Sequence, residues 1–190
     1  MEIIQKTIQP FGDASILLAH SPILDRFDRT FTYLRLALNE QCNLRCIYCM
    51  PEEGIDFRSE DKLLSTEEIF KLIELTSQMG VSKIRFTGAE PLLRKDLTEL
   101  VHFAHQCNGI ESVHLTTNGL LLSKQIDTLQ KAGLSGINIS LDTLDSDKFK
   151  KITRRDGLDL VLNSLQTSID SSIQSIKLNV VAMRDFNDDE

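Results

Sequence analysis

The sequence predicts an α/β fold made of parallel strand–helix–strand units. Short strand-like segments alternate with segments whose apolar residues recur at helical spacing, and the alternation runs through most of the 190 residues. Hydrophobic residues make up 41% and charged residues 26%, which is ordinary for a domain with one buried core. Five strands fit either an open doubly wound sheet or most of a (β/α) barrel. In both, chemistry is expected at the C-terminal ends of the strands.

Five segments are predicted to be strands, because they are short, mostly rich in β-branched residues and bounded by Gly, Asn or Asp. They are residues 33–38, 83–86, 112–116, 136–141 and 175–181.

Helices are predicted between the strands. Ser65 can cap the first helix, Glu68 completes a capping box, and Gly80 suits its end. The apolar stripes of the helices are interpreted as packing surfaces. Further helical patterns cover residues 96–106, 124–132 and 158–169.

The chain is acidic, with 21 Lys and Arg against 28 Asp and Glu and a net charge of −7. This makes it a poor candidate for non-specific nucleic-acid binding, which depends on neutralising phosphates. No apolar run reaches the ~18 residues that span a membrane, and residues 1–10 lack the features of a secretory signal. A cytoplasmic protein without nucleic-acid or membrane partners is expected, with an N-terminal arm over 1–32 and a core over 33–190.

Three of the four cysteines lie directly after the first predicted strand. Cys42, Cys46 and Cys49 form the pattern C-x3-C-x2-C. Three thiolates can bind three irons of a cubane cluster and leave the fourth iron free for a small chelating molecule. A zinc site, which usually has two C-x2-C pairs, and a redox C-x-x-C are the alternatives. The fourth, Cys107, is expected to be a small buried apolar residue.

The cysteine loop resembles the signature of the radical S-adenosylmethionine (SAM) superfamily, where it follows the first strand of a partial TIM-type (β/α) barrel. Further motifs extend the match and are similar to the GTP 3′,8-cyclases, which begin molybdenum cofactor biosynthesis. The resemblance implies a partial barrel that is truncated after the fifth strand, without the C-terminal region that holds a second cluster. The motifs are residues 25–29, 50–52, 83–92, 116–119, 138–142 and 177–181.

The resemblance also implies the site residues. Cys42, Cys46 and Cys49 would ligate a [4Fe–4S] cluster whose open iron binds SAM, and no catalytic residue is implied beyond these ligands. SAM-binding residues are implied at Tyr48, Gly88, Ala89, Glu90 and Ser140. GTP-binding residues are implied at Arg35, Arg85, Thr116 and Lys177.

One of these residues departs from the family. Ala89 stands where the family has glycine, so a positive φ at this position, or a close approach of the cofactor, would make its methyl group unfavourable. Among the basic residues, Arg35 and Arg85 lie in apolar strands, where a guanidinium is costly unless it meets an anion such as phosphate. Pairing with a carboxylate or with solvent is the alternative. The pair Arg154 and Arg155 is interpreted as a solvated loop.

The implied activity is that of a lyase. The reduced cluster would cleave SAM, and the resulting 5′-deoxyadenosyl radical would take the 3′ hydrogen of GTP so that the sugar attacks C8 of the base. The implied partners are GTP, a reductant protein such as flavodoxin, and a second copy of the chain. Without the second cluster, little or no cyclised product is expected from this chain. Another radical SAM reaction, or a non-catalytic fragment that keeps cluster and SAM binding, are the alternatives.

Overall fold

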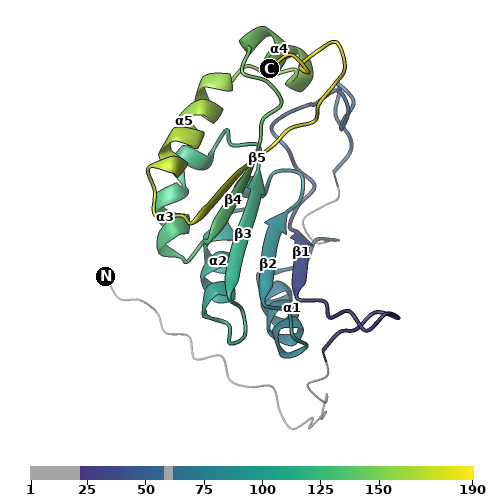
Figure 1. Cartoon of the computed structure of the whole chain (residues 1–190), viewed down its shortest axis with the longest axis vertical. Coiled ribbons are helices and arrows are strands. Elements are labelled where there is room, and N and C mark those ends of the chain that lie inside the picture. Colours follow the sequence, from purple (N-terminus) through teal and green to yellow (C-terminus); the bar gives the residue numbers. More distant parts are fainter. Residues whose placement is uncertain (1–21, 58–61) are drawn as a thin grey trace.

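A computed structural model describes residues 22–57 and 62–190, which contain one parallel five-stranded sheet (Figure 1). Residues 1–21 of the expected arm lie outside this range. The rest of the arm includes an antiparallel bridge between Leu24 and Thr30. The strands are β1 (Tyr33–Ala37), β2 (Lys83–Thr87), β3 (Ser112–Thr117), β4 (Gly136–Ser140) and β5 (Ser175–Asn179). All five predicted strands are confirmed, and β5 ends two residues earlier than expected.

The strand order distinguishes the two architectures that the sequence allows. The strands lie in the order β1-β2-β3-β4-β5, and every neighbouring pair is parallel. A doubly wound sheet reverses its order at a switch point, whereas barrel strands follow one another in chain order. The sheet is therefore of the (β/α)-barrel type, and the predicted partial barrel is confirmed.

The helices also agree with the sequence patterns. Ser65 and Glu68 form the predicted capping box: Ser65 Oγ accepts from Glu68 N at 3.2 Å, and Glu68 Oε2 accepts from Ser65 N at 2.8 Å. Among the described residues no helix is long and apolar enough to cross a membrane. The helices are α1 (Thr66–Gln78), α2 (Leu97–Gln106), α3 (Ile126–Lys131), α4 (Ser146–Thr153) and α5 (Leu158–Ile169), with short 3-10 turns at Pro91–Leu93 and Leu122–Lys124.

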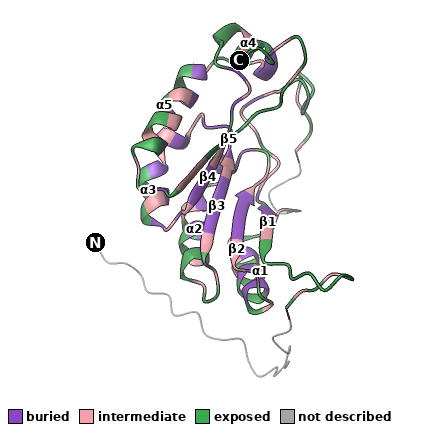
Figure 2. Ribbon diagram, viewed as in Figure 1, coloured by how far each residue is buried: buried purple, intermediate pink, exposed green. Residues whose placement is uncertain are grey.

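The two faces of the sheet differ in chemistry, because side chains alternate along each strand. Side chains such as Leu36, Phe86, Leu115 and Ile139 are buried in the core with the apolar stripes of the helices. The central strands are the most buried and β5 is the most exposed (Figure 2). This packing holds the strand ends, and the loops that follow them, in fixed positions.

The opposite side, here called the polar face, carries no Asp or Glu. Its members come from all five strands and lie in register, so that Arg35, Arg85, His114 and Gly136 form one row across the sheet. Thr116, Asn138 and Lys177 lie in the next row. The polar face consists of Tyr33, Arg35, Ala37, Lys83, Arg85, Thr87, Ser112, His114, Thr116, Gly136, Asn138, Ser140, Ser175, Lys177 and Asn179.

Candidate active site

The cysteine loop is a compact turn shaped by its own backbone. The amides of Cys49 and Met50 both donate to the carbonyl oxygen of Cys46, each at 2.9 Å. Arg45 Nη1 donates to the carbonyl oxygens of Cys42 and Leu44 at 2.7 and 2.8 Å. The carbonyls are thereby satisfied within the loop, and the three thiols remain available for a ligand.

The last turn of α4 also holds this loop. Arg45 N and Ile47 N donate to the carbonyls of Thr153 and Ile152, each at 2.9 Å. Arg154, which caps α4 in a left-handed conformation (φ 55°), donates from Nη1 to the carbonyls of Arg45 and Met50 at 3.1 and 3.0 Å. The solvated-loop interpretation of Arg154 is therefore wrong: the free carbonyls of the helix end dock onto the loop and bring its guanidinium there.

The three thiols lie on one loop but differ in exposure. Cys42 and Cys46 are half-buried, and Cys49 is exposed. Burial raises the pKa of the Cys42 thiol, and burial together with the neighbouring thiolates raises the pKa of Cys46 to about 11. Only a thiolate binds metal. Because their pKa values are raised, these thiols would lose their protons when a positively charged metal group binds.

The donor set fits a cluster better than a single ion. Within residues 22–57 and 62–190, no group of three or more His, Cys, Asp or Glu could hold one metal ion. A cubane attaches each thiolate to a different iron, so its ligands stand farther apart than those of one tetrahedral ion. Three soft thiolates on one loop are the ligands that iron–sulfur clusters take in proteins.

Two of the expected SAM contacts, Tyr48 and Ser140, line one small cavity at the cysteine loop. A small cavity of about 40 Å³ is lined by Cys46, Tyr48 and Ser140, together with Asn118 and Asp142. Tyr48 donates its phenolic hydrogen to Asp142 Oδ2 at 2.6 Å. Desolvation, reinforced by this bond to a carboxylate, raises the pKa of Tyr48. The loop and the end of β4 therefore share a cavity next to a thiol.

The turn after β2 contains Gly88, Ala89 and Glu90. Gly88 has φ 129°, and a Cβ there would lie 2.8 Å from the carbonyl oxygen of Asn39, so this position requires glycine. Ala89 is exposed and is not among the residues with positive φ in the described chain. A positive φ is therefore not the reason why glycine would be needed here, and a close approach of the cofactor stays a prediction.

Glu90 is completely buried and joins the ends of two strands. Its Oε1 accepts from Thr117 Oγ1 at 2.8 Å and from Leu92 N at 3.0 Å, and its Oε2 accepts from Asn118 N at 2.7 Å. Desolvation raises the pKa of Glu90, against the effect of these three donors. Glu90 therefore links the turn after β2 to the end of β3.

Asn118 and Asp142 were not singled out from the sequence, although both lie in the strand-end motifs. Asn118 Nδ2 donates to Asn43 Oδ1 at 2.7 Å and lies 3.8 Å from Cys42 Sγ. Asp142 Oδ1 accepts from Val181 N at 2.8 Å while its other oxygen holds Tyr48. Their position directly after a strand was the available signal, since side chains there point to the functional edge of a barrel.

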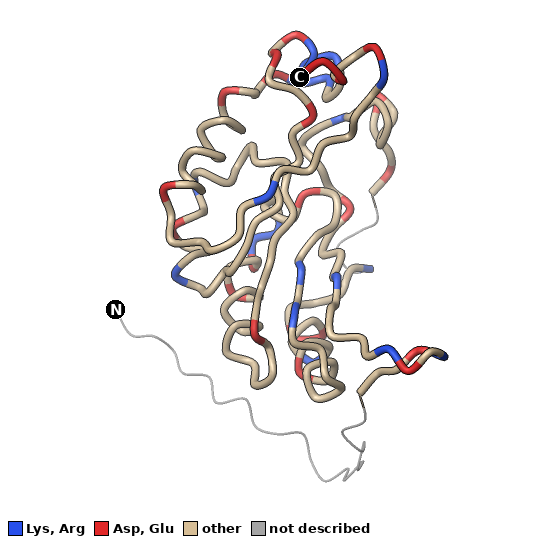
Figure 3. Tube along the Cα trace, viewed as in Figure 1, with Lys and Arg blue, Asp and Glu red and all other residues tan. Residues whose placement is uncertain are grey.

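The residues expected to bind GTP lie on the polar face. Arg85 Nη1 donates to Thr116 Oγ1 at 3.3 Å, and Arg85 and Arg35 both donate from Nε to the phenolic oxygen of Tyr33, at 2.6 and 3.0 Å. Lys177 is exposed on β5, two strands away from Thr116. Figure 3 shows segments coloured for Lys and Arg along the strands of the sheet. In the described part of the chain, no ion pair joins Arg35, Arg85 or Lys177 to a carboxylate.

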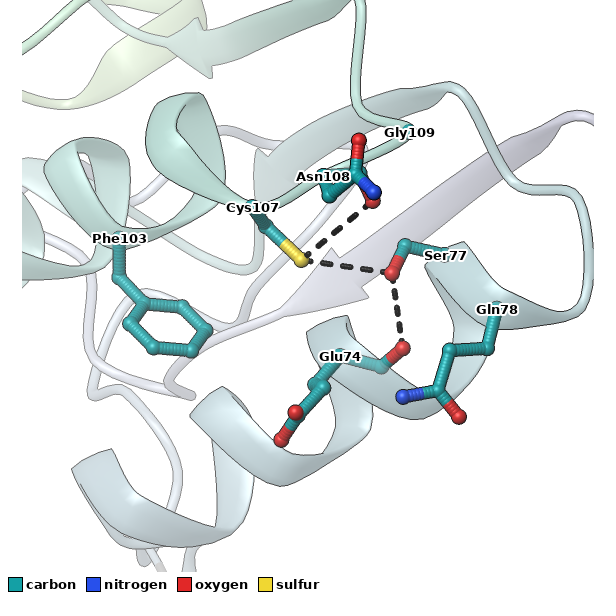
Figure 4. A pocket seen from close by; sticks show the side chains of 7 residues that line it. All are labelled: Glu74, Ser77, Gln78, Phe103, Cys107, Asn108 and Gly109. Atoms are coloured by element: carbon teal, nitrogen blue, oxygen red, sulfur yellow. Dashed lines mark hydrogen bonds between the residues drawn. The ribbon is translucent and has the colours of Figure 1, made fainter. Parts of the chain in front are cut away.

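Cys107 lies away from this site, at the end of α2. It is only half-buried and borders a cavity of about 630 Å³ beside Phe103 and Ser77 (Figure 4). Its Sγ is 3.3 Å from Ser77 Oγ. The expectation of a buried Cys107 is wrong, because the residue follows the last turn of α2, where the apolar stripe ends.

Comparison with known proteins agrees with this geometry. Residues 37–190 match the family described as "Radical SAM superfamily". The chain is 48% identical over 186 residues to "Molybdenum cofactor biosynthesis protein 1" of Dictyostelium discoideum, covering 98% of this chain and 29% of that protein. It is 45% identical over 168 residues to "GTP 3′,8-cyclase" of Clostridium botulinum, covering 88% of this chain and 53% of that protein. The chain thus spans about half, or less, of the length of these relatives.

Solved structures share the fold. The complex of Streptococcus suis SuiB with the precursor peptide SuiA superposes with a TM-score of 0.66 at 19% identity, over 80% of this chain and 33% of that one. At this identity the likeness concerns the fold alone.

Proposed function

The chain belongs to the radical SAM superfamily, and from this membership we propose that it carries the radical-generating part of a GTP 3′,8-cyclase. Members of the superfamily use a [4Fe–4S] cluster and SAM, so these are the cofactors of the chain. One observation carries the proposal. A C-x3-C-x2-C loop follows β1 directly, and the polar face of the same sheet bears four basic residues and no acid.

We assign the cluster to Cys42, Cys46 and Cys49. The assignment is supported by their common loop and by the bonds from α4 that hold the loop. When bound, the cluster supplies the electron that cleaves SAM. Asn118 and the guanidinium of Arg154 keep the loop in place, which positions the thiolates.

We assign SAM to the space beside Cys46, next to Tyr48, Ser140 and the turn of Gly88, Ala89 and Glu90. This turn is held against the loop, since Glu90 N donates to the carbonyl of Gln41 at 2.9 Å and Ala89 N to that of Asn39 at 3.2 Å.

We assign the triphosphate of GTP to Arg35, Arg85, Thr116 and Lys177. A nucleoside triphosphate carries several negative charges, and guanidinium and ammonium groups without carboxylate partners are suited to receive them. The chain's contribution is to bind and orient the nucleotide so that its ribose faces the radical source.

The proposal is tested with the full 190-residue chain after anaerobic reconstitution. Iron per chain and 5′-deoxyadenosine release are measured for the wild type and for Cys42→Ser, Cys46→Ser, Cys49→Ser and Cys107→Ser. We expect each loop variant to lose iron and 5′-deoxyadenosine, whereas Cys107→Ser, the matched control outside the loop, keeps both. Retention of the full iron content by all three loop variants would refute the proposal.

The same samples distinguish the alternatives. A bound cluster with no 5′-deoxyadenosine release would identify a non-catalytic binding fragment. SAM cleavage without GTP binding would identify a radical SAM reaction on another substrate. Little or no cyclised GTP is expected from this chain alone, and abundant cyclised product would contradict that expectation. The reductant protein such as flavodoxin, the homodimer and the cytoplasmic location remain predictions.

A further inference from the structure

The cations of the polar face are gathered around one phenol instead of a carboxylate. Tyr33 lies at the start of β1, and its oxygen accepts from Arg85 Nε at 2.6 Å and from Arg35 Nε at 3.0 Å. The Lys83 ammonium lies 5.6 Å from the centre of the Tyr33 ring, and the Arg35 guanidinium lies 5.3 Å from it. One aromatic side chain therefore contacts three positive groups.

The guanidiniums of Arg35 and Arg85 have hydrogen-bond donors that no described protein group accepts. A guanidinium has five N–H donors. Within the described residues, Arg85 uses Nε and Nη1, the latter toward Leu115 O and Thr116 Oγ1, and Arg35 uses only Nε. Both Nη groups of Arg35 and the Nη2 group of Arg85 remain available for a ligand.

The phenol itself is also left with a free donor. Its oxygen receives two charged N–H groups, and no acceptor for its own hydrogen is present in the described part of the chain. Desolvation acts to raise the pKa of Tyr33, but the two guanidiniums outweigh it and lower that pKa. An anion on this face would accept the phenolic hydrogen and compensate the positive charges at the same time.

We propose that Tyr33 is a positioning residue that holds the guanidiniums of Arg35 and Arg85 in one orientation and donates its own hydrogen to the polyphosphate that they bind. The proposal rests on the proposed function, because GTP supplies that polyphosphate. Each Nε is engaged by the phenol, so the remaining Nη groups keep a fixed direction before the ligand arrives, which reduces the entropy lost on binding. Phenylalanine would keep the ring but not this constraint.

Binding is measured by calorimetry with inorganic tripolyphosphate on the reconstituted full chain. We expect Tyr33→Phe to weaken the affinity about tenfold, as removal of a hydrogen bond between charged partners does. In an Arg35→Gln background the same substitution should have a clearly smaller effect, since Tyr33 acts partly through that guanidinium. Thr128→Val, which removes the hydroxyl of an exposed residue of α3 outside the polar face, is the control and should leave tripolyphosphate affinity unchanged.

A second measurement needs no variant. With only two tyrosines and no tryptophan, the ionisation of Tyr33 can be followed by NMR of isotope-labelled tyrosine at Cζ. We expect tripolyphosphate to shift the titration of Tyr33 to higher pH, because the bound anion opposes the formation of phenolate.

The outcomes are separable from those for the proposed function. An unchanged affinity in Tyr33→Phe, an unmoved titration of Tyr33, or no binding of tripolyphosphate by the wild type would each overturn the inference, whether or not SAM is cleaved. A Tyr33-dependent affinity in a chain that releases no 5′-deoxyadenosine would support the inference and count against the proposed function.

Discussion

Tyr48 donates its phenolic hydrogen to Asp142 Oδ2 at 2.6 Å, and this bond joins the cysteine loop to the end of β4 across 94 positions of the chain. The same carboxylate accepts from Val181 N at 2.8 Å, so it also holds the segment after β5. A single aspartate thus connects three parts of the molecule around the cavity next to Cys46.

Removal of this carboxylate charge should loosen the SAM cavity more than the cluster. Asp142→Asn keeps the size of the side chain but weakens both hydrogen bonds, and we expect a loss of about 1–2 kcal/mol in unfolding free energy. Iron content should remain near that of the wild type, while SAM binds more weakly. Unfolding in denaturant and SAM calorimetry measure the two effects. Equal SAM affinity in both proteins would contradict this prediction.

Arg154 should be necessary for cluster retention although it is not a ligand. Arg154→Ala removes the two bonds to the carbonyls of Arg45 and Met50, and we expect lower iron content and a loss of about 1–3 kcal/mol in stability. Arg154→Gly should be less destabilising than Arg154→Ala by up to about 1 kcal/mol, because glycine tolerates φ 55°.

Iron content and unfolding free energy are measured for both Arg154 variants. Arg155→Ala is the matched control, since Arg155 is exposed and, among the described residues, its guanidinium bonds only to the neighbouring Arg154 carbonyl. If Arg155→Ala lost as much iron as Arg154→Ala, a general charge effect would explain the result instead of the two hydrogen bonds from Arg154 to the loop.

The two residues of the turn after β2 should respond in opposite ways to exchange between alanine and glycine. Gly88→Ala places a methyl group 2.8 Å from the Asn39 carbonyl oxygen at φ 129°, so we expect a loss above about 2 kcal/mol. Ala89→Gly should change stability by less than about 1 kcal/mol and SAM affinity by less than about twofold. Thermal unfolding and SAM binding test both, and tighter SAM binding by Ala89→Gly would show that the methyl group obstructs the cofactor.

His114 should make stability depend on pH. It is 7% exposed, and desolvation together with the charges of Lys83, Arg85 and Lys177 lowers its pKa from 6.5 to about 4. As the pH falls, the unfolded chain therefore takes up a proton on His114 before the folded chain does. The contribution of His114 to stability is complete above pH ~6.5 and is lost as the pH falls toward the folded pKa. The limit of this loss is about 3 kcal/mol.

The pH effect is measured by denaturant unfolding between pH 4 and 8 of His114→Asn and of His102→Asn, an exposed control. The slope should become smaller only in the first. The buried imidazole also depends on its neighbour on β4, since a Cβ at Gly136 would lie 2.3 Å from His114 Nδ1. Gly136→Ala should therefore be strongly destabilising, and a second substitution, His114→Ala, should restore part of the loss.

Much of the fold was predictable because local patterns and tertiary packing agree. The capping box at Ser65 and Glu68 and the strand segments matched the structure to within two residues. Strand order was not predictable from periodicity, because the same alternation serves doubly wound sheets and barrels. The resemblance carried by the cysteine loop selected the barrel before the sheet order did.

The site was predictable only where its chemistry is local. Three cysteines in eight residues are visible in the sequence. The contact of Arg154 with the cysteine loop is not visible there, because it joins residues 109 positions apart. A basic residue after a helix is usually solvated. Tyr33 was hidden for a related reason: its partner Arg85 lies 52 positions away on the neighbouring strand.

The attachment of the cysteine loop to α4 has a consequence for the order of events during synthesis. The thiols leave the ribosome long before the helix end whose carbonyls and arginine fix their loop. Until that helix has been made and has docked, the nascent loop has none of these tethers, and its cysteines are ordinary, separated thiols. We therefore expect iron delivery to the wild-type chain to follow the docking of α4.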